Sequence, residues 1–69
     1  MKNDSLQLQV QSALLQDPLT EDSDIEVLDS NGIVTLRGIV HSREARDRAE
    51  ALVRTLDGVT SVINELDVI

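Results

Sequence analysis

The sequence predicts an α+β domain with the order α-β-β-α-β, in which a three-stranded mixed sheet has both helices packed on one face. Three observations predict this fold. Two segments repeat apolar residues at helical spacing, three segments have the composition or alternation of strands, and an Asn-Gly pair separates the first two strands. Because 69 residues suffice for one domain, we expect a single domain over 1–69 with an ordered core over about 4–69.

The first helix is expected to end at Gln16, because Pro18 disfavours the α conformation at the residue before it. Asp4 or Ser5 can act as its N-cap by accepting a hydrogen bond from the first turn. An acidic connection over 17–24 follows the helix. One face of the helix repeats apolar residues at i, i+4, i+7 and i+8, namely Leu6, Val10, Ala13 and Leu14.

The next two strands, over 25–28 and 33–40, are expected to form a hairpin with a turn at 29–32. Gly32 is expected to take the positive φ that such a tight turn requires. Gly38 lies inside the second strand, where a glycine marks a β-bulge or allows a helix to pack closely.

The second helix is predicted over 43–56, with Ser42 as N-cap and Gly58 as the left-handed residue that follows its C-terminus. Its apolar stripe consists of Ala45, Ala49, Leu52, Val53 and Leu56. Its charged residues can pair at i,i+4 spacing, as Arg43 with Asp47, Glu44 with Arg48, Arg46 with Glu50, and Glu50 with Arg54.

The third strand is predicted over 60–68, parallel to the second strand because a helix connects them. The first two strands are expected to be antiparallel. Its helix-facing residues are Val62, Asn64, Leu66 and Val68. A core-facing Asn64 amide must be hydrogen-bonded, so we expect it to tie this strand to a loop or helix end, with a ligand-facing role as the alternative.

The opposite face of the sheet has no predicted cover. Alternation directs Arg37 and several aliphatic residues to this face, namely Leu28, Ile33, Ile39 and Ile63. Together with Arg43 and Arg46 of the second helix, these are the candidate residues for binding a lipid or a protein partner. Pro18, Gly32, Gly38, Gly58 and Asn64 are interpreted as structural residues.

The composition excludes several functions. Thirteen acidic and six basic residues produce a net charge of −7, which phosphate backbones repel, and no aromatic residue is present to stack on bases, so no nucleic-acid partner is expected. The chain lacks Cys, and its single histidine, His41, has no evident catalytic partner. We therefore expect no enzymatic activity, no catalytic residue, no cofactor and no bound metal.

No apolar run approaches the roughly 18–20 residues that span a bilayer, and the first ten residues lack the apolar segment of a signal peptide. A cytoplasmic location is expected if the chain is complete. A periplasmic or cell-envelope location is expected if it is a domain of a longer exported protein.

The ordered set of motifs resembles the BON domain, a family named after bacterial osmotically inducible and nodulation proteins. The segment NGIVTLRGIV, followed by GVTSVINELDV, carries most of the resemblance. Further matching residues are Ala13, Leu14, Asp17, Pro18, Leu19, Ile25, Val27, Arg46 and Ala49. The resemblance implies an α-β-β-α-β fold and a non-catalytic module of bacterial envelope proteins, associated with phospholipid membranes or envelope partners and with osmotic stress.

Three functions from different classes remain open at this point. The resemblance favours a module that associates with lipid or the envelope. The exposed aliphatic residues favour a protein-interaction or self-association module that uses the open face of the sheet, including a homo-oligomer. The acidic connection over 17–24 permits a cation-binding module, although its spacing matches no calcium loop.

Overall fold

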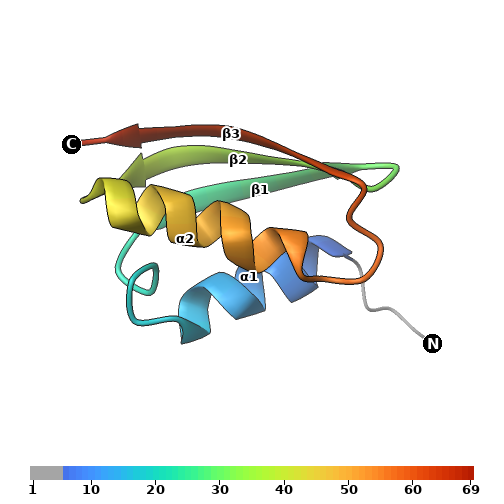
Figure 1. Cartoon of the computed structure of the whole chain (residues 1–69), viewed down its shortest axis with the longest axis horizontal. Coiled ribbons are helices and arrows are strands. Elements are labelled where there is room, and N and C mark those ends of the chain that lie inside the picture. The colour runs from blue at the N-terminus through green and yellow to red at the C-terminus, as the bar shows by residue number, and fades with distance from the viewer. Residues whose placement is uncertain (1–5) are drawn as a thin grey trace.

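The computed structural model describes residues 6–69, and its elements follow the predicted order (Figure 1). They are α1 (Leu6–Gln16), β1 (Asp24–Ser30), β2 (Ile33–Val40), α2 (Arg43–Arg54) and β3 (Ser61–Val68). The predicted α+β class is confirmed, as is the end of α1 before Pro18. The proposed N-caps of α1, Asp4 and Ser5, lie outside the described residues.

The sheet has the strand order β1-β2-β3, in which β1 is antiparallel to β2 and β2 is parallel to β3. Both predicted orientations are confirmed. Figure 1 shows α1 and α2 side by side on one face of the sheet. Because α2 connects β2 to β3, the chain returns along the helix and enters β3 in the direction of β2.

The hairpin turn contains only Asn31 and Gly32, since β1 continues to Ser30, which pairs with Ile33. The prediction that the first strand ends at residue 28 and the turn starts at residue 29 was therefore wrong. Asn31 has φ 53° and Gly32 has φ 85°. Two successive residues with positive φ form a turn whose twist matches the strands, so pairing continues to its edge.

Gly38 has a different role from the one predicted. The register between β1 and β2 runs without interruption past the pair Ile25–Gly38, so Gly38 marks no bulge. Its φ is 129°, and a Cβ atom placed there would collide with the backbone carbonyl oxygen of Asp24. The close approach that requires glycine is thus made by the neighbouring strand and not by a helix.

The Oγ of Ser42 accepts a hydrogen bond from the Ala45 N–H at 3.1 Å, which confirms Ser42 as the N-cap of α2. The helix ends at Arg54, two residues before the predicted end. The N–H groups of Thr55 and Leu56 bond to carbonyls three residues earlier, and this tighter turn stops the α-helix. Gly58 has the expected positive φ, 95°, but lies in a later turn and not directly after the helix. β3 begins at Ser61, one residue later than predicted.

The core lies between the sheet and the two helices. Its buried members are Val10, Leu14, Val27, Val34, Leu36, Val40, Ala45, Ala49, Val53 and Leu66. Both predicted helical stripes contribute to it, with Leu6, Leu52 and Leu56 packed at its margin. Val68 is an exception among the residues predicted to face the helices, because it lies exposed at the end of the edge strand β3.

Candidate functional site

The face of the sheet turned away from the helices is open, since no element among residues 6–69 packs over it (Figure 1). We call this surface the outer sheet face. Strand alternation and register assign twelve residues to it, namely Asp24, Glu26, Leu28, Ser30, Ile33, Thr35, Arg37, Ile39, Ser61, Ile63, Glu65 and Asp67.

Cross-strand pairing divides the outer sheet face into two halves. Next to the hairpin turn, Leu28, Thr35 and Ile63 form one row across the three strands, and Ile33 lies in the adjacent row. Leu28, Ile33 and Ile63 are 41%, 42% and 44% exposed. These residues form an apolar half whose side chains remain in contact with water.

The other half is acidic. Glu26, Arg37 and Glu65 form one row, and Asp24, Ile39 and Asp67 form the next. The Arg37 Nε lies 3.4 Å from an Oε of Glu65, so the one basic group among these twelve residues already has a carboxylate partner. Four carboxylates against one guanidinium leave this half with a negative charge. Ile39 is half-buried in its centre.

The predicted lipid- or partner-binding residues therefore do not form one surface. Leu28, Ile33, Arg37, Ile39 and Ile63 share the outer sheet face, as the alternation indicated. Arg43 and Arg46 belong to α2, on the opposite side of the sheet (Figure 1). The Nε of Arg46 lies 3.7 Å from the carboxylate of its neighbour Asp47. Arg37 is thus separated by the sheet from Arg43 and Arg46, and the three arginines do not form one basic patch.

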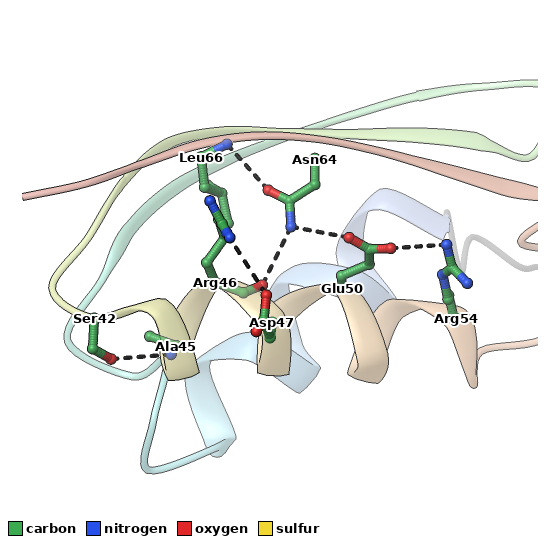
Figure 2. Close-up of polar contacts among 8 residues, drawn as sticks. All are labelled: Ser42, Ala45, Arg46, Asp47, Glu50, Arg54, Asn64 and Leu66. Carbon is green, nitrogen blue, oxygen red and sulfur yellow. Dashed lines mark hydrogen bonds and ion pairs between the residues drawn. The ribbon is translucent and has the colours of Figure 1, made fainter.

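Asn64 connects β3 to the middle of α2, as Figure 2 shows. Its Nδ2 donates to the Arg46 carbonyl at 3.3 Å and to the Glu50 carboxylate at 3.2 Å, while its Oδ1 accepts from the Leu66 N–H at 3.1 Å. Both the nitrogen and the oxygen of the Asn64 amide are thus hydrogen-bonded within the protein. The amide ties β3 to the middle of α2, and not to the loop or helix end that we expected. A core-facing amide in this arrangement holds α2 and β3 at a defined distance.

The charged side chains of α2 make only part of the predicted pairing. Glu50 pairs with Arg54 at 2.8 Å, as predicted, and its other carboxylate oxygen accepts the bond from Asn64 (Figure 2). Arg46 contacts Asp47 and not Glu50. Arg48 bonds to Asp17 in place of Glu44, and Asp47 has Arg46 as its neighbour in place of Arg43, so neither of the two remaining predicted pairs forms within the described residues.

The carboxylate of Asp17, the first residue of the acidic connection, is bonded on both of its oxygens. One carboxylate oxygen accepts the Leu19 N–H at 3.0 Å, and the other lies 2.9 Å from the Arg48 Nε. The backbone hydrogen bond from Leu19, together with the bond and charge of Arg48, lowers the pKa of Asp17 below its ordinary value of 3.8, and burial of the carboxylate opposes this shift. Asp17 is therefore engaged in joining the connection to α2.

The structure gathers no cation site in this connection. Among residues 6–69, no group of three or more His, Asp or Glu side chains is placed to hold a metal ion. His41 is exposed on the link between β2 and α2. In the same part of the chain, no helix has the length and apolar character needed to cross a bilayer.

The structure shows a second exposed apolar surface that was not predicted from the sequence. Leu8 and Leu15 are 58% and 65% exposed and lie seven residues apart, on the same outward side of α1. We call these two leucines the α1 surface. The helix that carries them contains no charged residue. The spacing of seven residues between these two leucines was visible in the sequence. It was not used because the stripe through Val10 and Leu14 already predicted the helix.

Thr20 was also missed. It is almost completely buried, and its hydroxyl donates to the Leu14 carbonyl near the end of α1 at 2.5 Å. The groove beside it, about 270 Å³ in volume, lies between α1 and the start of β1 and is bordered by Leu15, Ser23 and Asp24. No two side chains that line this groove are paired as a catalytic nucleophile and its general base.

Comparison with known proteins agrees with this description. The family model for the BON domain matches residues 2–69 of the chain. The osmotically-inducible protein Y of Escherichia coli (strain K12) is 36% identical over 58 residues. This match covers 84% of the present chain but 29% of that relative, so the chain corresponds to less than a third of the relative's length.

Proposed function

Since the chain belongs to the BON domain family, whose members are generally non-catalytic, we propose that it is a binding module that associates with lipid bilayers through the α1 surface. The observation that supports the proposal is the pair of exposed leucines, Leu8 and Leu15, on a helix without charged residues. An interfacial helix places such an apolar side between the headgroups and the acyl chains.

The absence of charge on α1 matters energetically. Burying a fully exposed leucine side chain contributes about 1.5–3 kcal/mol, and a half-exposed one contributes a fraction of this. No charged group of α1 has to lose its hydration when the helix enters the interface. Two leucines therefore support weak, reversible association and not permanent anchoring.

The charge distribution predicts which membranes are bound. Attraction to an anionic leaflet contributes about 1 kcal/mol per basic residue near the surface. Here the net charge is −7, and Arg37, Arg46, Arg48 and Arg54 each have a carboxylate neighbour. We therefore expect apolar contact, and not headgroup charge, to drive the association.

Vesicle flotation tests the proposal. We expect the protein to float with phosphatidylcholine vesicles, and to float less with an equal mixture of phosphatidylcholine and phosphatidylglycerol at low salt. Addition of salt should reduce this difference, because it screens the repulsion. A fluorescent label or peptide-bond absorbance is needed for detection, since the chain has no Phe, Tyr or Trp.

Two matched variants locate the contact. The double variant Leu8→Gln and Leu15→Gln should abolish flotation, whereas Leu28→Gln with Ile63→Gln, which removes similar apolar surface from the outer sheet face, should leave it unchanged. Flotation that requires phosphatidylglycerol and low salt, and that survives the α1 substitutions, would contradict the proposal and favour the arginines instead.

A further inference from the structure

The outer sheet face combines two properties that restrict what can cover it. Its apolar half, formed by Leu28, Ile33 and Ile63 with Thr35, adjoins the hairpin turn. Its acidic half occupies the next two rows along the strands, and adjacent rows are about 7 Å apart. Exposed aliphatic residues and acidic residues are each common on protein surfaces. Here they occupy opposite ends of one face, so a partner must present complementary groups in the same order along the strands.

A lipid surface does not match it. The acidic half presents Asp24, Glu26, Glu65 and Asp67, and its one cation, Arg37, is 3.4 Å from Glu65. Contact with phosphate headgroups would bring like charges together. The α1 surface also lies on the helix side of the sheet, so association through α1 leaves the outer sheet face directed away from the bilayer (Figure 1).

A second copy of the chain matches the face poorly. Two outer sheet faces stacked with their strands in the same direction would oppose four carboxylates from each copy. Stacking in the opposite direction would place each acidic half on the apolar half of the other copy, which would bury charges without partners. Only a partial overlap of the two apolar halves avoids both arrangements, and it leaves much of the face uncovered.

We propose that the outer sheet face docks a protein partner whose contact surface has aliphatic side chains at one end and Lys or Arg side chains at the other. The aliphatic end covers Leu28, Ile33 and Ile63. The basic end lies over the rows of Glu26 and Asp24, where it pairs with the carboxylates that Arg37 leaves without a counter-charge. This partner differs in kind from the lipid proposed for α1, and it contacts a different set of residues, so the two proposals can be tested separately.

A titration followed by backbone amide NMR tests the proposal with a defined probe. The probe is a capped peptide whose first half alternates Ile with Thr and whose second half alternates Lys with Thr. The control peptide carries Glu in place of Lys. We expect saturable shifts confined to the three strands, centred on Thr35 and Arg37, and an affinity for the Glu peptide lower by about tenfold or more.

Charge reversal provides the sharper test. Glu26→Lys with Glu65→Lys should exchange the preference, so that the Glu peptide binds more tightly than the Lys peptide. If that pair of substitutions impairs folding, as judged by circular dichroism, Asp24→Lys with Asp67→Lys serves the same purpose. The control variant Leu8→Gln with Leu15→Gln should bind both peptides as the wild type does.

Three results would overturn the proposal. The first is shifts that map to α1 or α2 and not to the strands. The second is a preference for the Lys peptide that persists after charge reversal, since this would mean that the net charge of −7 and not the outer sheet face attracts the probe. The third is sedimentation of the wild-type protein as a dimer that Leu28→Lys with Ile63→Lys dissociates, which would identify a second copy as the occupant.

Discussion

The carboxylate of Asp17 lies 2.9 Å from the Nε of Arg48, across a separation of 31 residues in the sequence. Asp17 directly follows α1, and Arg48 lies in the middle of α2, so this pair joins the C-terminal end of α1 to α2. The other oxygen of the carboxylate accepts the Leu19 N–H, which shapes the turn that leads away from α1. One side chain thus organises a local turn and a distant contact.

The first prediction concerns acid stability. Because the folded-state pKa of Asp17 is below its ordinary value of 3.8, the carboxylate contributes stability that is fully present above that value. This contribution should be lost as the pH falls below about 4 and through the folded pKa. Asp17→Asn should therefore lower the melting temperature at pH 7 and flatten its dependence on pH below about 4.

Thermal melting by circular dichroism between neutral and acidic pH measures this effect. Asp22→Asn is the matched control, because Asp22 lies exposed in the same connection. It should change neither the melting temperature at pH 7 nor the decrease in melting temperature below about pH 4. If Asp17→Asn showed the same decrease below about pH 4 as the wild type, the pair with Arg48 and the bond from Leu19 would not stabilise the fold.

The second prediction concerns Gly38. Gly38→Ala should destabilise the protein by about 3 kcal/mol or more, because it combines a strained φ with a collision against the Asp24 carbonyl oxygen. A domain of this size has only about 3–5 kcal/mol of stability, so the variant should be largely unfolded. Gly58→Ala is the control, since its φ is also positive but its Cβ meets only Leu6, at 3.9 Å. It should cost about 1–2 kcal/mol.

Urea unfolding followed by far-ultraviolet circular dichroism compares the two glycine variants. Equal stabilities would mean that the backbone near Asp24 moves aside at little cost, and that positive φ alone explains the effect of both substitutions.

The third prediction concerns Asn64. Asn64→Ala should lower the free energy of unfolding by about 1–2 kcal/mol, because the Leu66 N–H and the Arg46 carbonyl lose their partner in a half-buried position. Asn64→Asp retains an acceptor for Leu66 but places a second carboxylate beside Glu50. It should therefore be the less stable of the two at pH 7 and recover as the pH falls towards about 4. Urea unfolding at both pH values distinguishes the two variants, and an aspartate variant insensitive to pH would argue against the contact with Glu50.

The fourth prediction concerns the start of α2. Ser42→Ala should cost about 1 kcal/mol, since the Ala45 N–H loses its acceptor. For a domain of this length, such a loss lowers the melting temperature by about 4–8 °C. Ser42→Asp keeps an acceptor and adds a negative charge at the helix N-terminus, so it should melt at or above the wild-type temperature. If both variants lost stability equally, the hydroxyl would not be acting as a cap.

The sequence by itself determined the order of elements, their approximate limits and the residues that start or stop them. Ser42, the Asn31–Gly32 turn and Pro18 act within a few residues of their own position, so their effects can be inferred from local preferences. The apolar stripes of α2 and the alternation in β2 also identified most of the core, because burial must follow the period of each element. The outer sheet face with Leu28, Ile33 and Ile63 followed from the same alternation.

Only the tertiary structure decided which distant groups meet. The bond between Asp17 and Arg48, the anchoring of Asn64 on Glu50 and the row of Glu26, Arg37 and Glu65 depend on strand register and on how α2 lies on the sheet. The role of Gly38 was equally hidden, because it depends on the approach of the Asp24 backbone. These contacts join residues that are far apart in the chain. Periodicity and propensity describe only residues that are close in sequence, so such contacts are defined only when the elements pack against one another.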